Sequence, residues 1–501
     1  MILTCREMRA LEERAIADGV GAEELMEEAG RRIADVVRHF CYFARKCIIF
    51  FGKGHNGGDA LVAGRHLANS GYSIELRGVF PESEWAELTA RKHEELRTVL
   101  NANPSVIQKT FVWPTRIQPA AILDGLLGIG AGGALREPIR GATREMNARR
   151  ASSNARVFAL DLPTGLDADT GGADPDTVIG DYTLTIGFAK QGLLADAATH
   201  FVGRLAVLPL DELSKRAIPG NGDVVATPEI LRQTLPRRNF DTHKGKCGRI
   251  GIVAGSRGFV GAAIMASEAC VRAGAGLITL FVLEDIYPIV AAAVSPEVMV
   301  TPVKSYLDVL EAKFDVIAIG PGLGLAHASE VRQIVERAPQ PMVVDADALN
   351  VLASNIHVLG RCAGPRLLTP HPGEMARLDP QSAQRGRRET VEAFTSRWPH
   401  VLLLKGARTV IGQEGHAVSY NTTGSPGMAT GGMGDVLTGV CAALAGQGLA
   451  LYDAARTGAW LCGRAAEIAL SGGSHSEESL TPSSLMSQLG PAFEALRGSG
   501  Y

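Results

Sequence analysis

The stretch Asn421–Gly439, NTTGSPGMATGGMGDVLTG, constrains the fold of this chain more than any other part of its 501 residues. Glycines crowd together at positions 424, 427, 431, 432 and 434, and apolar residues follow at helical spacing (Val436, Leu437, Val440, Ala443 and Leu444). The pattern predicts a glycine-rich loop that runs into the amino terminus of a helix. Unpaired backbone N–H groups and the positive end of the helix dipole at such a terminus favour an anion such as phosphate.

Asp435 stands where the predicted loop becomes the helix. An aspartate in this place can cap the helix by accepting a hydrogen bond from the first turn. A carboxylate beside a phosphate site repels its ligand, but it is useful if it takes a proton from a hydroxyl that attacks a phosphoryl group. The residues alone leave both roles open.

The totals fit an ordinary globular protein of two or three domains. Hydrophobic residues make up 46% and charged residues 21% of the chain, and 58 glycines occur without a collagen-like period. This composition favours an α/β protein with many functional turns. The formal net charge of −3 gives no reason to expect a nucleic-acid partner.

Eight cysteines are scattered along the chain without a CxxC pair, most of them in apolar runs. This pattern favours reduced, buried thiols over disulfides or zinc ligands. The first residues, MILTCREMRALEERAI, are charged and helical in period, so no signal peptide is visible, and no uncharged apolar run reaches the ~18 residues of a membrane span. We therefore expect a cytoplasmic protein with no membrane partner.

In the first half of the chain, polar residues follow a series of apolar strands. The run CIIFF (47–51) predicts a buried strand before a loop with Asn56, and later strands end near Asp124 and Asp161. The carboxyl ends of strands in an open parallel sheet line one crevice. Asn56, Asp124 and Thr164 bring hard oxygen donors there, which suits one shared monovalent or divalent cation, although each alone is more often a turn former or cap.

The loop after the first strand also matches GxGxxG at Gly52, Gly54 and Gly57, with Glu75 near the spacing of a ribose-binding acid. That pattern is typical of dinucleotide-binding folds. Asp59 argues against such a site, because it places a carboxylate where a pyrophosphate needs N–H donors. The loop is therefore predicted to serve another purpose.

The loops of this half resemble those of the nicotinamide nucleotide hydrate epimerase family. The family's patterns are close to NNGGDG, DALLGTG, DIPSGL and KPGL, and this chain reads HNGGDA, DGLLGIG, DLPTGLD and KQGL. The departures are His55 for a usual Asn, Ala60 for a usual Gly, and Glu28 for the Asn of a usual MENAG. The resemblance implies a Rossmann-like parallel-sheet domain over residues 1–218.

The same resemblance implies the site residues of this domain. Asn56, Asp124 and Thr164 would hold a potassium ion. Asp161 and Lys190 would move protons at C6 of the hydrated nicotinamide ring, and the sequence does not say which of them is the acid. The implied substrate contacts are His55, Asn56, Gly57, Gly58, Asp59, Gly128, Ile129, Gly130, Ala131, Gly132, Gly133, Ala134 and Asp161.

Residues 211–240 mix charge, proline and glycine without a sustained strand, so we expect a linker near residues 215–225. From residue 243 onwards strands and helices alternate again, and several strands end in turn residues, as in FDVIAIGPGLG and QPMVVDADALN. The alternation predicts a second α/β domain over residues 225–501, with ligands at the carboxyl ends of its strands.

The second half resembles the nicotinamide nucleotide hydrate dehydratase family of the ribokinase-like superfamily. The shared segments are HKG, VRAGAGL, IGPGLG, VVDADALN, LLTPHPGEMARL, LLKGARTV and GMATGGMGDVLTG. The resemblance implies contacts to the hydrated dinucleotide from Ala262, Gly322, His371 and Asp435. It implies contacts to an adenine nucleotide from Lys405, Gly406, Ala407, Arg408, Thr409 and Gly434.

Two of these residues also have a plain structural interpretation. His371 stands between Pro370 and Pro372 and fits either a satisfied loop histidine or a substrate contact. Lys405 follows an apolar run, where an exposed lysine is common and where it can also reach a nucleotide phosphate.

By resemblance to bacterial members joined to an epimerase, ADP is the phosphoryl donor and Mg²⁺ its expected partner. Asp435 would take the proton of the C6 hydroxyl as that oxygen attacks the β-phosphoryl group, while backbone N–H groups of residues 429–434 stabilise the charge. Phosphate would then leave C6, restoring NADH or NADPH and releasing AMP. The resemblance thus implies a bifunctional enzyme that epimerises R- and S-NAD(P)HX (the hydrates NADHX and NADPHX) and dehydrates the S form. We expect a homo-oligomer.

Three other functions stay open on the residues alone. The nearest is a ribokinase-like kinase that phosphorylates a vitamin-like alcohol with ATP and carries a ligand-binding first half. A first half that only binds a ligand or partner is a second, and the presence of both Asp161 and Lys190 argues against it. A Rossmann dehydrogenase is the third, and it predicts hydride transfer with NAD.

Overall fold

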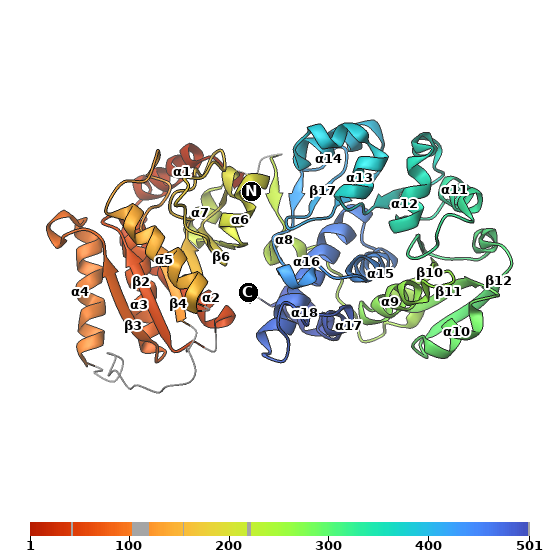
Figure 1. Ribbon diagram of the computed structural model, residues 1–501, viewed down its shortest axis with the longest axis horizontal. Coiled ribbons are helices and arrows are strands. Elements are labelled where there is room, and N and C mark those ends of the chain that lie inside the picture. Colours follow the sequence, from red (N-terminus) through yellow and green to blue (C-terminus); the bar gives the residue numbers. More distant parts are fainter. Residues whose placement is uncertain (42–43, 103–119, 154, 218–221, 499–501) are drawn as a thin grey trace. The chain divides into compact units, whose positions relative to one another are not determined.

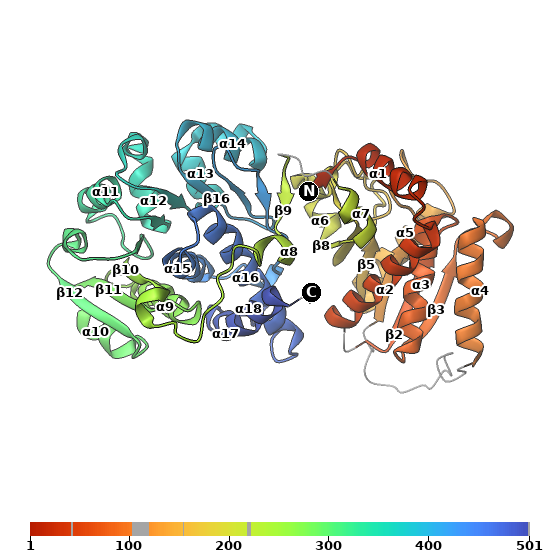
Figure 2. The same ribbon diagram turned by 180° about the vertical axis from the view of Figure 1, so that it is seen from behind.

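The computed structural model describes residues 1–41, 44–102, 120–153, 155–217 and 222–498. The chain folds as two compact units, Met1–Gly220 and Asn221–Gly500, and each contains one large sheet with helices on its faces (Figures 1 and 2). The predicted α/β class with parallel sheets is confirmed. The predicted domain limits, 1–218 and 225–501, stay a prediction, because residue 218 and residues 499–501 lie outside the described part of the chain.

The first unit is built on a parallel sheet of order β3-β2-β4-β5-β6-β8. Its strands are β2 (Lys46–Phe51), β3 (Ser73–Gly78), β4 (Ala120–Gly125), β5 (Arg156–Leu160), β6 (Tyr182–Ile186) and β8 (Arg204–Leu208), and a separate short pair joins β1 (Ile2–Leu3) to β7 (Ala189–Lys190). Its helices are α1 (Cys5–Ala17), α2 (Ala22–Phe40), α3 (His55–Asn69), α4 (Glu87–Ala102), α5 (Ile139–Ser153), α6 (Thr199–Val202) and α7 (Asp211–Arg216).

Alternate residues of the central strands divide the core of this unit between two faces. Cys47, Ile49 and Phe51 pack with α2, α3 and α4, whereas Ile48 and Phe50 pack with α5. This two-residue period is what a strand covered on both sides requires. The apolar run predicted as a buried strand is therefore the middle of the sheet, and the loops after its strands lie at one edge.

The second unit contains a sheet of order β12-β11-β10-β13-β14-β15-β16-β17-β18-β9, parallel from β12 to β16 and antiparallel around β17. Its strands are β9 (Val224–Val225), β10 (Arg249–Val253), β11 (Leu277–Leu283), β12 (Val298–Val303), β13 (Val316–Ile319), β14 (Met342–Val344), β15 (Arg366–Leu368), β16 (Val401–Leu404), β17 (Val410–Gly412) and β18 (Ser419–Tyr420). Its helices are α8 (Pro228–Leu231), α9 (Val260–Arg272), α10 (Tyr287–Ala293), α11 (Ala328–Arg337), α12 (Ala346–Ala353), α13 (Pro372–Leu378), α14 (Arg387–Arg397), α15 (Met433–Gly446), α16 (Leu451–Ser471), α17 (Pro482–Ser487) and α18 (Leu489–Arg497).

Helix α15 lies at the centre of this unit, packed between α9 and α16 and against the middle of the sheet (Figure 1). Val436, Val440, Ala443 and Leu444 are all buried, so the apolar residues that predicted the helix also fix its place in the core. Burying α15 on several sides holds its amino terminus, and the glycine-rich loop before it, at a defined position.

Among the described residues, no helix is long and apolar enough to cross a membrane. The described cysteines form no disulfide, as the scattered pattern predicts.

Candidate active sites

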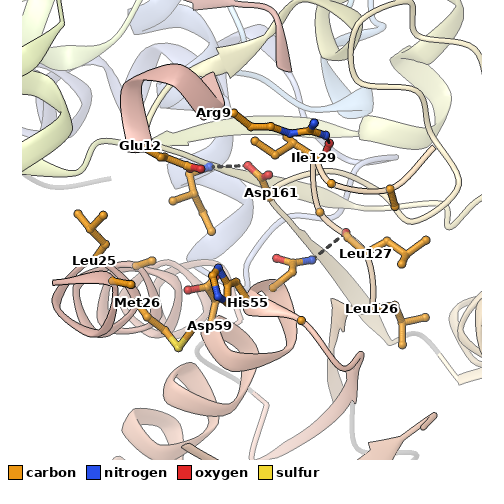
Figure 3. Close-up of a pocket in the computed structure, with 18 of the residues that line it drawn as sticks. Arg9, Glu12, Leu25, Met26, His55, Asp59, Leu126, Leu127, Ile129 and Asp161 are labelled. Carbon is orange, nitrogen blue, oxygen red and sulfur yellow. Dashed lines mark hydrogen bonds between the residues drawn. The ribbon is translucent and has the colours of Figure 1, made fainter. Parts of the chain in front are cut away.

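A cavity of about 580 Å³ opens at the carboxyl ends of β2, β4 and β5 (Figure 3). Its wall includes several of the predicted substrate contacts: His55, Asn56, Asp59, Gly128, Ile129, Gly130, Ala131 and Asp161. Residues of α1 and α2 complete it with the apolar side chains of Ile16, Leu25 and Met26. The sheet therefore brings the predicted loops together at one edge, as parallel strands should.

The remaining predicted contacts of this unit do not line the cavity. Gly57 and Gly58 lie in the first turn of α3, where an added Cβ would meet the Gly52 carbonyl oxygen at 2.2 Å and the Met26 side chain at 2.5 Å. Their observed role is close packing. Gly132, Gly133 and Ala134 are exposed residues further along the same loop as Gly128.

Asp161 directly follows β5 and lines the cavity with a positive φ of 65°, a backbone conformation that non-glycine residues rarely adopt. Its backbone N–H donates to Leu184 O at 2.8 Å, which ties it to the neighbouring strand. Lys190 Nζ donates to its carboxylate, to Thr185 Oγ1 at 3.1 Å and to Ile186 O at 2.8 Å. Lys190 is 1% exposed and is not part of the cavity wall. The ammonium group of Lys190 therefore contacts Asp161 from the protein interior, on the side away from the cavity.

Two of the three predicted cation ligands, Asp124 and Thr164, are hydrogen-bonded to each other, and the third, Asn56, is part of the cavity wall. Thr164 donates to Asp124 from its backbone at 2.8 Å and from its hydroxyl at 2.7 Å. Asn56 donates from Nδ2 to Leu127 O and Leu160 O, which leaves its Oδ1 buried without a hydrogen-bond donor among the described residues. A buried oxygen of this kind is costly unless a cation or water meets it, so the residues present fit a cation.

Burial also acts on the carboxyl groups of this region. It raises the pKa of Asp124 to about 6, against the hydrogen bonds from Thr164 and Leu126 that lower it. The pKa of Asp59 lies well above its usual range because of burial and of the nearby carboxylates of Asp161 and Glu12.

Two residues of this cavity wall, Arg9 and Glu12, escaped the sequence analysis. Both belong to α1, whose apolar spacing predicts only packing on a sheet. Arg9 donates to Ile129 O in the predicted substrate loop. Burial, and then the charge of Asp161, raise the pKa of Glu12 to about 7.

The glycine-rich loop of the second unit ends in an unsatisfied set of donors. The backbone N–H groups of residues 430–435 donate to no other described residue, and the first bond of the helix runs from Val436 N to Gly432 O at 3.1 Å. Gly432 is the N-cap, with φ of 90°. The predicted loop and helix terminus are thus present, with the donors that an anion needs.

Asp435 is the third residue of α15, so it is not the N-cap residue itself, and its side chain makes no capping bond. Burial, followed by the carboxylates of Asp345 and Asp347, raises its pKa to about 7, while Lys405 acts in the opposite direction. A carboxyl group poised near neutral pH beside unpaired N–H groups suits a general base.

Lys405 follows β16 and is held by carboxylates. Its Nζ donates to Asp345 Oδ1 at 2.8 Å and lies 3.8 Å from Glu374 Oε2. Burial alone lowers the pKa of Lys405, but the charges of Asp345 and Glu374 outweigh it and raise the pKa. Asp345 is 1% exposed and also accepts from Thr438 Oγ1 of α15 at 2.7 Å. Asp345 was not singled out in the sequence analysis, although it follows strand β14 directly.

The other predicted residues of this unit divide into two groups. Gly322 and Ala262 are neighbours, since a Cβ at Gly322 would lie 2.9 Å from the Cβ of Ala262. His371 caps α13, accepting from Gly373 N at 3.0 Å through Nδ1, and its side chain is 51% exposed.

The predicted nucleotide loop shows mixed exposure. Gly406 and Ala407 are exposed and Thr409 is half-buried, whereas Arg408 is buried. Arg408 is buried as a whole, at 2% exposed, and its carbonyl oxygen accepts a hydrogen bond from Arg387. The structure therefore does not expose this predicted nucleotide contact to a ligand.

Two family models match the chain. One, described as "NAD(P)H-hydrate dehydratase", matches residues 250–489, and one described as "YjeF-related protein N-terminus" matches residues 22–192. Among solved structures, the ADP/ATP-dependent NAD(P)H-hydrate dehydratase from Bacillus subtilis, co-crystallised with ATP/Mg²⁺, is similar to 55% of this chain over 99% of its own (29% identity, TM-score 0.48).

Two curated relatives extend over nearly the whole chain. The bifunctional NAD(P)H-hydrate repair enzyme Nnr of Moorella thermoacetica is 38% identical, over 93% of this chain and 92% of the relative. The enzyme of the same name from Escherichia coli is 36% identical, over 91% of this chain and 87% of the relative. This chain belongs to the family of bifunctional NAD(P)H-hydrate repair enzymes.

Proposed function

We propose that this chain repairs hydrated NADH and NADPH in two steps, epimerisation in the first unit and ADP-dependent dehydration in the second. Membership of the family supports both steps. The observation that carries the proposal is the site at α15, where the Asp435 carboxyl group stands beside the unpaired N–H groups of residues 430–435. That combination suits the activation of an alcohol next to a bound phosphate.

In the first unit, the cavity beside Asp161 receives the hydrated nicotinamide ring. The hydroxyl at C6 leaves with the help of the ring nitrogen's electron pair, and water returns to either face of the same carbon. Asp161, which accepts a hydrogen bond from Lys190, takes a proton from the water that adds. No redox cofactor is needed, because the oxidation state of the ring does not change.

A potassium ion held by Asn56, Asp124 and Thr164 is part of this proposal. The unpartnered oxygen of Asn56 and the buried carboxylate of Asp124 supply hard ligands next to the cavity. When bound, such an ion supplies positive charge that favours an anionic group of the substrate. Asn56 would belong both to the potassium site and to the substrate cavity, because it is also part of the cavity wall.

In the second unit, Asp435 takes the proton of the C6 hydroxyl as this oxygen attacks the β-phosphoryl group of ADP. The P–O bond to the α-phosphate breaks and AMP leaves, while residues 430–435 donate hydrogen bonds to the charge in transfer. The C6–O bond then breaks with the phosphate as leaving group. Loss of a proton from C5 restores the dihydronicotinamide, so one ADP yields one AMP and one phosphate.

The remaining predicted contacts complete this site. Gly322 and Ala262 give one surface for the hydrated dinucleotide, and Lys405 with the backbone of residues 406–409 and Gly434 gives the surface for ADP. Mg²⁺ is the expected partner of the diphosphate and would neutralise part of its charge.

The test is the stoichiometry of the products. Incubation of the chain with ADP and hydrated NADH is expected to give AMP, phosphate and NADH in equal amounts. A ribokinase-like kinase would instead transfer phosphate from ATP to an added alcohol and leave the hydrate unchanged. Formation of a stable phosphorylated alcohol, with no AMP from ADP, would overturn the proposal.

A further inference from the structure

Epimerisation needs two proton-transfer groups at the substrate, one that protonates the departing hydroxyl and one that deprotonates the returning water. Of the pair predicted for this task, only Asp161 lines the cavity. Lys190 is 1% exposed and uses its ammonium hydrogens on Asp161, Thr185 and Ile186 O. Lys190 therefore acts through Asp161, and the cavity requires a second group of its own.

We propose that Glu12 on α1 is the second proton-transfer residue of the epimerase site, acting on the C6 oxygen together with Asp161. Glu12 is part of the cavity wall, and Figure 3 shows its carboxyl group on the same side of the cavity as Asp161. The family model for this unit begins at residue 22, so α1 lies outside the matched segment. This inference rests on the proposed epimerase function and adds a residue to it.

The surroundings of Glu12 suit an acid that carries its proton near neutral pH. The charged groups that act on it are Asp161 on the same side of the cavity, Asp59 on the other side, Lys190 behind Asp161, and Arg9 and Glu13 on its own helix. Ile186, Leu210 and Leu213 add apolar side chains to the cavity wall, and Lys53 and His55 line it as further titratable groups. Burial, followed by the negative charge of Asp161, raises the pKa of Glu12 to about 7. Lys190 donates a hydrogen bond to the Asp161 carboxylate.

The step balances with these two carboxyl groups. The C6–O bond breaks, the ring nitrogen's electron pair forms a C=N⁺ bond, and the proton of Glu12 passes to the departing oxygen to make water. Water then adds to C6, its proton passes to Asp161, and the electron pair returns to the ring nitrogen. Proton transfer from Asp161 to Glu12 through the cavity restores the starting state, with no net consumption of any reactant.

Asp59 is the alternative carboxyl group, since it also lines the cavity. It lies on α3 one turn after His55, and Figure 3 shows both of them apart from Asp161. Glu12 is the better candidate because it shares the Asp161 side of the wall, and the experiment must separate the two.

The test uses the full chain without ADP, so that only epimerisation proceeds, and follows the conversion of one purified NADHX epimer by chromatography across a pH series. Glu12→Gln is expected to lower kcat by about 100-fold or more, with KM changed by less than about threefold. In the unmodified chain kcat should fall as pH rises through about 7, because Glu12 loses its proton. This decline should be absent in Glu12→Gln and retained, at lower kcat, in Glu12→Asp.

Three controls keep the outcome decisive. Glu13→Gln changes an exposed neighbour and should match the unmodified chain. The ADP-dependent step, measured on the S epimer, should be unaffected by Glu12→Gln, which shows that the second unit is folded, and the activity retained in Glu12→Asp shows the same of the first unit. If Glu12→Gln keeps kcat and the decline, or if Asp59→Asn abolishes the decline in its place, the role of Glu12 is overturned. If the unmodified chain does not epimerise at all, the proposed function fails, and the role of Glu12 with it.

Discussion

Lys405 Nζ donates a 2.8 Å hydrogen bond to Asp345 Oδ1, and Gly434 of α15 lies directly over this pair. Asp435 follows on the same helical turn, so the carboxyl group that we propose as base shares its surroundings with a buried ion pair. These contacts connect the residues after β14 and β16, Asp345 and Lys405, to the amino terminus of α15. They explain why Asp435 holds its proton near neutral pH even though a lysine stands close by.

Replacing Gly434 with alanine should weaken the binding of ADP without lowering the stability of the fold. A Cβ at this position would lie 3.4 Å from Lys405 Nζ and 3.6 Å from Asp345 Oδ2, which is ordinary contact, and alanine favours a helix by about 1 kcal/mol over glycine. We expect unchanged or higher thermal stability and a KM for ADP raised about tenfold, because the methyl group narrows the approach of the phosphates.

Gly490→Ala is the matched control, because Gly490 is also the second residue of a helix and has open space around it. It should leave the KM for ADP unchanged. An equal KM for ADP in Gly434→Ala would contradict the assignment of Gly434 to the nucleotide site.

Asp435→Asn should abolish dehydration while leaving epimerisation intact. The amide cannot accept the hydroxyl proton, so we expect a loss of about 10²–10⁴-fold in the ADP-dependent kcat, measured on the S epimer. Epimer exchange, measured on the same preparation without ADP, should remain within twofold of the unmodified chain, because its cavity belongs to the other unit. Loss of both activities, or of neither, would contradict two independent sites.

The stability of the chain should depend on pH through Asp435. Its pKa rises from 3.8 to about 7 on folding, so the folded state keeps a proton that the unfolded chain loses in this range. The stabilisation present below pH 3.8 is lost as pH rises through about 7. Asp435→Asn is therefore expected to exceed the unmodified chain in unfolding free energy by about 1–2 kcal/mol at pH 8, after allowance for solvent screening.

Thermal unfolding of both proteins near pH 4 and at pH 8 measures this difference. The gap should shrink at the lower pH, where Asp435 is protonated in the folded chain. A gap that is constant with pH would show that the Asp435 carboxyl does not titrate as described.

Potassium should support epimerisation through Asn56. Leaving a buried acceptor such as Asn56 Oδ1 without a partner costs about 1–3 kcal/mol, and a bound cation removes that cost. In potassium chloride we expect a higher thermal midpoint and a rate of epimer exchange about tenfold or more above that in tetramethylammonium chloride of equal ionic strength. Equal rates and equal midpoints in the two salts would argue against a cation at this position.

The sequence predicted the fold because its signals are local. The run at residues 47–51 alternates between two faces of the sheet, and the apolar positions after Asp435 bury α15 on several sides. Asp124 and Asp161 were found because each stands at a strand end. The same signal could have found Asp345, which directly follows β14.

Other features depend on contacts between distant parts of the chain. Glu12 lies at the cavity because α1 crosses the strand ends, an arrangement in which Leu3 of β1 pairs with Lys190 of β7. Helical spacing in α1 carries no sign of that pairing. Lys190, which belongs to β7, donates its ammonium hydrogen to Asp161. Lys190 was predicted to act at the substrate, but it is not part of the cavity wall.

The most direct test of the two-step account is the recovery of reduced-nicotinamide absorbance from a mixture of R and S hydrates. With ADP, the unmodified chain should convert both epimers completely, whereas Asp161→Asn should convert the S fraction rapidly and stop there. Without ADP neither protein should restore the absorbance. Recovery without ADP, or complete and equally rapid recovery by Asp161→Asn, would contradict the account.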